Sequence, residues 1–178
     1  YTINNDKIRD IFKFFYFVFL EKGKRFFPIP FQAWITYCIY SLYRENGLRL
    51  RKYAVIWKAR KNGKTGFTSI LALNELLKGA DDAEVYFLAT TAKQASQALK
   101  YLKSTISLSP ALKKRVDVLT FHLRHGHSIA KPLASNANNL DGLNPSLAII
   151  DESHAHKTRD LFNIMDSGMK ARKEPLLL

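Results

Sequence analysis

Apolar residues gather in three short blocks, and each block ends at a cluster of polar or charged residues. The blocks lie at residues 53–57, 84–90 (EVYFLAT) and 147–152 (LAIIDE), and their length predicts buried strands. Elsewhere apolar residues recur at helical spacing, which predicts helices at 8–20, 32–44, from Lys64 onward, at 91–107 and at 159–170. Strands that alternate with helices indicate an α/β fold, with a mostly parallel sheet flanked by helices and an N-terminal helical extension. A shorter strand is expected at residues 116–121.

Residues 55–71, VIWKARKNGKTGFTSIL, combine the end of the first strand with a tight loop and the first turns of a helix. This order is typical of a phosphate-binding loop, in which backbone N–H groups point at phosphate oxygens. Gly63 permits close approach of the ligand, Lys64 is placed between the β- and γ-phosphates, and Thr65 is placed to bind Mg²⁺. The usual pattern has a glycine where this chain has Lys58, so a basic surface turn is the alternative interpretation. The predicted nucleotide contacts in the loop are Arg60, Lys61, Asn62, Gly63, Lys64 and Thr65.

The block at residues 147–152 ends in two adjacent carboxylates, Asp151 and Glu152. A parallel sheet places ligands at the carboxyl ends of its strands. We therefore expect Asp151 to hold Mg²⁺ opposite Thr65, and Glu152 to face the attacking water. The alternative is that Glu152 is simply an exposed carboxylate at the end of a strand.

Two further residues are candidates for contacts with the nucleotide. Gln32 follows two prolines and lies among aromatic residues upstream of the loop, which suits adenine recognition because an amide both donates and accepts hydrogen bonds. A glutamine that instead satisfies the backbone at the start of a helix is the alternative. Arg60 is expected to reach the γ-phosphate as an in-chain arginine finger or sensor, and general neutralisation of phosphate charge is its other possible role.

Composition bounds the size of the protein and its partners. The 178 residues, 47% of them hydrophobic, suffice for one domain with a substantial core. A net charge of +13 and a pI near 9.9 favour a polyanionic partner, without distinguishing DNA, RNA and anionic lipid. The single cysteine, Cys38, excludes an internal disulfide, and the apolar run at 14–20 is shorter than the roughly 20 residues that cross a bilayer. Histidines near Asp151 indicate a transition-metal site only weakly, because Mg²⁺ already accounts for the carboxylates.

Four motifs, spread over nearly the whole chain, resemble the ATPase domain of tailed-phage terminase large subunits of the HK97-like family. They are PIPFQ at 28–32, ARKNGKT at 59–65, ATTAKQA at 89–95 and LDGLNPSLAIIDESHAHKTRDLF at 140–162. Such terminases typically lack the first glycine of the loop, so Lys58 agrees with the resemblance. Members of the family are motors that hydrolyse ATP to package double-stranded DNA into procapsids.

The resemblance implies a P-loop NTPase fold of the ASCE, RecA-like class and an ATPase that uses ATP and Mg²⁺. The roles it implies are adenine contact for Gln32, phosphate and Mg²⁺ contacts for Arg60, Lys64 and Thr65, metal binding for Asp151 and catalysis for Glu152. The implied partners are double-stranded DNA, the portal protein, the small terminase subunit and further copies in a homo-oligomeric ring, with no membrane. The implied location is the host cytoplasm, at the procapsid portal. In the ring a neighbouring subunit supplies a trans arginine, for which Arg124 and Arg172 are candidates.

We expect residues 1–52 to form a helical, adenine-binding segment packed on a P-loop ATPase core at 53–178. The apolar residues at 176–178 indicate that the core continues, and in this family a nuclease domain follows, so the full-length protein is expected also to be an endonuclease. The main alternative is a superfamily 2 helicase-like, DNA- or RNA-dependent ATPase, because the sequence DESH at 151–154 resembles a DExH box. A scaffold that binds ATP and DNA without hydrolysis is a further alternative. A small-molecule kinase is disfavoured, because adjacent Asp and Glu position a water rather than an acceptor hydroxyl.

Overall fold

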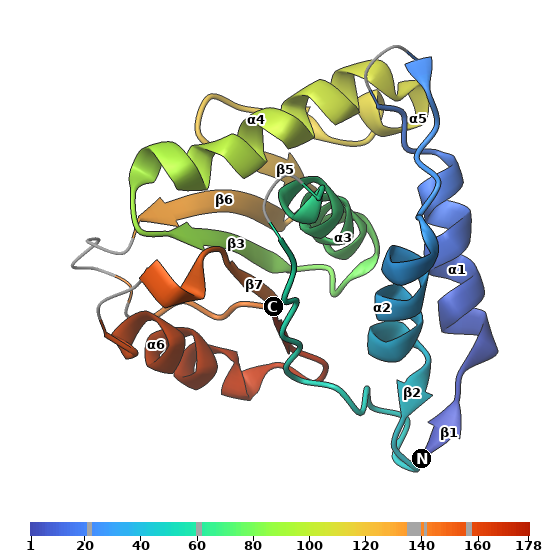
Figure 1. The fold of residues 1–178 in the computed structure, drawn as a ribbon, viewed down its shortest axis with the longest axis vertical. Coiled ribbons are helices and arrows are strands. Elements are labelled where there is room, and N and C mark those ends of the chain that lie inside the picture. Colours follow the sequence, from blue (N-terminus) through green and yellow to red (C-terminus); the bar gives the residue numbers. More distant parts are fainter. Residues whose placement is uncertain (21–22, 60–61, 135–139, 141, 156–157) are drawn as a thin grey trace.

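The centre of the structure is a six-stranded sheet, whose strands lie in the order β4 (Asp117–Val118), β5 (Leu123–His125), β6 (Ser128–Ala134), β3 (Glu84–Ala89), β7 (Leu147–Ile150) and β8 (Leu176–Leu177) (Figure 1). The computed structural model describes residues 1–20, 23–59, 62–134, 140, 142–155 and 158–178. β3 pairs in parallel with β6 on one side and β7 on the other, and β8 continues the parallel part beside β7. β4 and β5 form an antiparallel edge. The predicted α/β fold with a mostly parallel sheet is therefore confirmed.

Helices cover both faces of the sheet, which gives three layers (Figure 1). α3 (Lys64–Lys78) and α4 (Ala92–Leu108) pack on one face together with Val85 and Phe87, while α6 (Asp160–Gly168) packs on the other face together with Tyr86 and Leu88. This division follows from β3 itself, because successive side chains of a strand point to opposite faces. The apolar residues of β3 are thus buried on both faces of the sheet, and alternate residues pack against the two helical layers.

The N-terminal extension consists of α1 (Asn5–Tyr16) and α2 (Pro30–Tyr40), which lie beside α3 (Figure 1). Phe14 and Phe15 of α1 belong to the same buried core as Ile70 and Leu71 of α3. The helix predicted at 8–20 begins earlier, because Asn4 caps it by accepting a hydrogen bond from the Lys7 backbone N–H at 3.0 Å. It also ends earlier, since the backbone after Tyr16 turns into a bridge between Phe19 and Arg25.

The helix predicted at 32–44 is also shorter, because the chain after α2 enters β2 (Leu42–Tyr43), which pairs with β1 (Thr2–Ile3) in a small antiparallel sheet. The predicted cap of α4 is confirmed: the Thr91 side chain accepts from the Gln94 backbone N–H at 3.2 Å. The remaining short elements are α5 (Pro110–Lys113), η2 (Ser153–Ala155) and η3 (Met169–Ala171). In the described part of the chain, every helix is too short or too polar to cross a membrane.

The strand predicted at residues 53–57, before the phosphate loop, is wrong as a regular strand. Its described pairing is a single parallel bridge from Tyr53 to Leu177, supported by the Ala54 N–H, which donates to the Leu177 carbonyl at 2.9 Å. β8 has only two residues and pairs no further along this segment. Val55 and Trp57 are consequently 89% and 96% exposed, although Ile56 between them packs against the core. The side chains of this segment thus alternate between exposed and packed, as in a strand, although the backbone lacks a complete ladder of hydrogen bonds.

The sequence analysis missed β5 and β6, and the strand predicted at 116–121 is reduced to the two residues of β4. A tight turn at Gly126 and His127 joins β5 to β6, and Gly126 has a φ of 58°, which favours glycine. Pro132 concealed β6, because proline is rare inside sheets. Here β5 pairs only with residues 128–130 of β6, so Pro132 lies past the end of β5.

Candidate functional site

The phosphate loop leads directly into the N-terminus of α3. Gly63 is the N-cap residue, with a φ of 72° that ordinary side chains rarely adopt, and α3 begins at Lys64. Before it, the Asn62 side-chain amide donates to the Ala59 carbonyl at 3.2 Å. The first backbone N–H groups of a helix lack partners within the helix, so this end of α3 favours an anion.

The two carboxylates that end β7 lie against this loop. The Lys64 ammonium is 2.8 Å from Asp151 Oδ1 and 3.9 Å from Glu152 Oε1. Thr65 Oγ1 is 3.5 Å from Asp151 Oδ2. All three charged side chains are about one-third exposed, at 29%, 34% and 32%, so they are held in place yet open to a ligand. The structure thus brings together four residues that sequence analysis selected from two distant motifs.

Asp151 is fixed by the sheet. Its backbone N–H donates to the Leu88 carbonyl at 2.9 Å, which extends the pairing of β7 with β3 by one residue. The carboxylate therefore emerges at the carboxyl end of both strands, where parallel sheets bind ligands.

Glu152 has a strained backbone. Its φ of 53° lies in the left-handed region, and among the described residues it is the one non-glycine residue with a positive φ. The Glu152 backbone N–H donates to Asp151 Oδ1 at 3.0 Å, and η2 begins at the next residue. Such a conformation costs on the order of 1–3 kcal/mol and is concentrated at functional sites. The turn directs the carboxylate toward Lys64 rather than along the strand.

Gln32 also lies at this site. It is 7% exposed near the start of α2, and its Oε1 accepts from the Ile29 backbone N–H at 3.1 Å. Its Nε2 faces the loop, since a Cβ built on Gly63 would lie 4.0 Å from it. One end of the Gln32 amide thus satisfies the backbone, as the alternative interpretation expects, and the other end faces the phosphate loop, while adenine recognition stays a prediction.

Sequence analysis missed one contact here. The Lys58 ammonium lies 2.9 Å from the centre of the Phe31 ring, a cation–π contact that ties the loop to the residue before Gln32. In the sequence, Lys58 is distinguished only by its position, where the usual loop pattern has its first glycine. Nothing in the pattern of either segment indicated that the two side chains would meet, since they belong to separate elements.

Arg60 and Lys61, two of the predicted phosphate contacts, lie outside the described residues. Among the residues that the structure does describe, no three His, Cys, Asp or Glu side chains gather as a metal-binding group. The transition-metal alternative therefore gains no support from the part of the chain that is described.

Arg172, one of the two candidates for a trans arginine, is already paired within the chain, and its trans role stays a prediction. Its guanidinium donates to Asp82 Oδ1 at 2.6 Å and to the Asn144 carbonyl at 2.8 Å, and its side chain is only 9% exposed. Asp82 precedes β3, so Arg172 lies at the end of the sheet opposite Asp151. Arg124, which pairs with Asp117 at 3.0 Å on the edge of the sheet, stays a prediction.

Comparison with known proteins gives a consistent result. A family model described as the terminase large subunit, ATPase domain, matches residues 30–178. The crystal structure of the HK97 bacteriophage large terminase superposes with a TM-score of 0.82 at 24% identity, covering 96% of this chain and 36% of that one. The Thermus phage P74-26 large terminase ATPase domain, and a point mutant of the same domain, each give a TM-score of 0.60 at 17% identity, covering 72% of this chain and 59% of the other. No curated protein sequence matches.

Proposed function

Because the chain belongs to the family of terminase large-subunit ATPase domains, we propose that it is the motor domain that hydrolyses ATP to move double-stranded DNA into a procapsid. The observation that carries this proposal is the convergence of Lys64, Thr65, Asp151 and Glu152 at the N-terminus of α3. Family membership favours the packaging motor over the helicase-like alternative.

The residues present fit a magnesium site. Thr65 Oγ1 and Asp151 Oδ2 are 3.5 Å apart, and hydroxyl and carboxylate oxygens are ligands that Mg²⁺ prefers. When bound, Mg²⁺ neutralises charge on the β- and γ-phosphates. Lys64 and the N–H groups at the start of α3 bind the phosphates, and Arg60 adds a cation to them. Glu152, whose carboxylate lies beside the phosphate loop at 3.9 Å from the Lys64 ammonium, orients and deprotonates the attacking water.

We assign the recognition of adenine to Gln32. Its Nε2 donor faces the loop while its Oε1 is held by the Ile29 N–H, so the amide is fixed in one orientation. On this basis residues 1–52 form the adenine-binding segment, packed on an ATPase core at 53–178 through the shared core of α1 and α3.

The chain spans 36% of the length of the HK97 large terminase, so the activities of the whole protein are proposals as well. We propose that the full-length protein is also an endonuclease. Its partners are the portal protein, the small terminase subunit and further copies of itself in a ring at the procapsid portal in the host cytoplasm. A net charge of +13 supports a polyanionic partner such as double-stranded DNA.

The test is the ATPase rate of the full-length protein with and without double-stranded DNA, together with a packaging assay that measures DNA protected from nuclease by portal-bearing procapsids. We expect duplex DNA to stimulate hydrolysis, and Glu152→Gln to abolish both hydrolysis and packaging. Glu45→Gln, in an exposed turn, is the control and should change neither. An ATPase rate that ignores duplex DNA, with no protected DNA, would overturn the motor proposal.

A further inference from the structure

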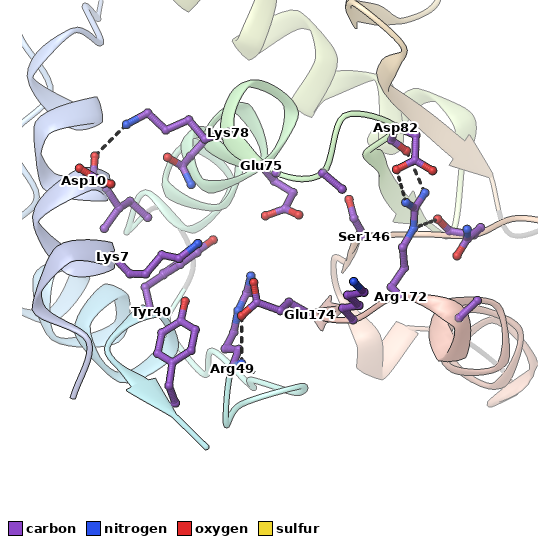
Figure 2. A pocket seen from close by; sticks show the side chains of 18 residues that line it. Lys7, Asp10, Tyr40, Arg49, Glu75, Lys78, Asp82, Ser146, Arg172 and Glu174 are labelled. Atoms are coloured by element: carbon purple, nitrogen blue, oxygen red, sulfur yellow. Dashed lines mark hydrogen bonds and ion pairs between the residues drawn. The ribbon is translucent and has the colours of Figure 1, made fainter. Parts of the chain in front are cut away.

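A second polar site lies at the other end of α3 from the phosphate loop. It is a cavity of about 630 Å³ between the N-terminal helices, the last turn of α3 and residues 171–174 (Figure 2). Tyr40 and Arg49 form one wall, and Glu75 of α3 lies opposite them (Figure 2). Its volume falls within the range of about 300–1,000 Å³ that is usual for small-molecule sites. Because Lys64 and Glu75 occupy opposite ends of one helix, the cavity is separate from the candidate nucleotide site.

Three buried donors in this wall lack hydrogen-bond partners among the described residues. They are the Tyr40 hydroxyl and the Nε and Nη1 groups of Arg49. Tyr40 is only 6% exposed, and burial raises the pKa of its phenol, so the hydroxyl keeps its proton. The Arg49 guanidinium lies 5.0 Å from the centre of the Tyr40 ring, so these donors are neighbours. Unpartnered buried donors are uncommon in folded proteins, and the N–H groups of a guanidinium form strong hydrogen bonds with carboxylate or phosphate oxygens.

Some of the other cations around the cavity already have partners within the chain. Arg172 is held by Asp82, and the Lys78 ammonium donates to the Asp10 carbonyl at 3.1 Å. Lys7, from α1, extends toward the cavity beside Tyr40 (Figure 2). The cavity therefore offers Arg49 and Tyr40 as its buried anion contacts, with an ammonium near the entrance.

We propose that this cavity binds a small ligand that carries an oxyanion, a carboxylate or a phosphate group, through the Arg49 guanidinium and the Tyr40 hydroxyl. The cavity volume of about 630 Å³ exceeds that of a carboxylate or phosphate group alone, so the ligand carries additional atoms beyond the oxyanion. This additional part carries an N–H donor, because Asn74 Oδ1, also in the wall, is a buried acceptor without a partner among the described residues.

Four carboxylates line the cavity, those of Asp10, Glu75, Asp82 and Glu174, and Asp82 is paired with Arg172. Glu174 Oε1 accepts from the Arg49 backbone N–H at 3.0 Å, which occupies that carboxylate. Glu75 is 6% exposed, and burial raises the pKa of its carboxyl, while the positive charge of Arg49 acts to lower it.

The experiment uses the full chain with Lys64→Ala, which removes phosphate binding at the loop. Thermal unfolding is followed while sodium phosphate or sodium acetate is titrated against sodium chloride of equal ionic strength. We expect one or both anions to raise the Tm in a saturable manner, because a ligand that binds only the folded state stabilises it. A rise with phosphate alone identifies a phosphate ligand, and a rise with acetate alone identifies a carboxylate ligand.

Tyr40→Phe removes only the unpartnered hydroxyl and keeps the buried ring. It should weaken the anion about tenfold, the usual effect of losing a hydrogen bond to a charged group. Arg49→Lys keeps the charge, loses the fork and should weaken binding at least as much. The control is Tyr16→Phe, at a ring that is 51% exposed in α1, and should leave the anion affinity unchanged. A Tm that responds to phosphate and acetate no more than to chloride, or an anion effect that survives Tyr40→Phe and Arg49→Lys, overturns the proposal.

Discussion

The Lys64 ammonium lies 2.8 Å from Asp151 Oδ1, so the first turn of α3 contacts the end of β7. Thr65, the next residue of α3, precedes Asp151 by 86 positions in the sequence. The contact places the cation of the phosphate loop beside the carboxylate that we propose to bind Mg²⁺. It is the geometry expected where a parallel sheet presents the carboxyl ends of its strands to a ligand.

Lys64→Ala should reduce ATP affinity by about 10- to 100-fold, because hydrogen bonds between charged groups are among the stronger ones. Titration with a fluorescent ATP analogue measures the change. Lys100→Ala, on the exposed surface of α4, is the matched control and should bind as the unmodified protein does. Unchanged affinity in Lys64→Ala would mean that the nucleotide binds elsewhere.

Glu152→Gln should lower the ATPase turnover by about 10²–10⁴-fold, because an amide cannot accept the proton of the attacking water. ATP affinity should be kept, since the amide is nearly isosteric and Lys64 and Thr65 are untouched. Steady-state hydrolysis and ATP titration on the same sample separate the two effects. Full turnover in this variant would show that Glu152 has no chemical role in hydrolysis.

Much of this site was predictable because its signals are local. A Gly-Lys-Thr sequence at the start of a helix and two carboxylates after an apolar block each specify a backbone position, and the parallel sheet brings those positions together. The strained φ of Glu152 was not predictable, since it is imposed by the turn between β7 and η2. The same holds for the contact of Lys58 with Phe31, which depends on how α2 docks beside the loop.

Sheet order was the part of the fold that sequence could not provide. β8 lies between β7 and the segment at 53–57, so β7 and the segment that leads into the phosphate loop are not neighbours. Hydrophobic pattern predicts that a strand exists but carries no information on its partner. The cavity of Tyr40, Arg49 and Glu75 was invisible for a related reason, because its wall is assembled from segments that are remote in the chain.

Asp166→Asn should flatten the pH dependence of stability in the acid range. The Tyr53 hydroxyl donates to Asp166 and, with Lys52 at 3.0 Å, holds the pKa of that carboxyl below its ordinary value of 3.8. Because the folded pKa is lower, the stabilisation is present above pH 3.8 and is lost as the pH falls through the folded pKa. The effect should stay below about 1 kcal/mol, since the pair is partly exposed.

Urea unfolding at a series of acid pH values measures this slope. Asp81→Asn, in the exposed turn before β3, is the control and should keep the slope of the unmodified protein. If Asp166→Asn follows the same curve as the control, the link between residues 52–53 and α6 contributes nothing measurable to stability.

Gly168→Ala should destabilise the protein by about 1–3 kcal/mol, the usual effect of overpacking. A Cβ at this position would lie 2.5 Å from the Leu143 carbonyl oxygen and 3.2 Å from Pro145 Cδ, so backbone must move. The segment that would be displaced leads into β7 and hence to Asp151. Ser167→Ala, at the neighbouring exposed residue, is the control and should change the free energy of unfolding by less than about 0.5 kcal/mol.

Gln32→Glu should reduce the preference for ATP over GTP. A glutamate keeps the oxygen that accepts from the Ile29 N–H at 3.1 Å, but it loses the Nε2 donor that faces the loop near Gly63. Gln32→Ala loses both, so it should also lower the free energy of unfolding by about 1 kcal/mol, as removal of a capping side chain does.

The ratio of ATP to GTP affinity is the informative quantity, because a new negative charge near the phosphates weakens both nucleotides alike. Competition of each nucleotide against a fluorescent analogue gives this ratio, which should fall about tenfold if one hydrogen bond to the base is lost. A Gln32→Glu protein that still prefers ATP to the same extent would show that the Nε2 group serves the loop and not the base. In that case adenine must be recognised by other residues of the N-terminal extension.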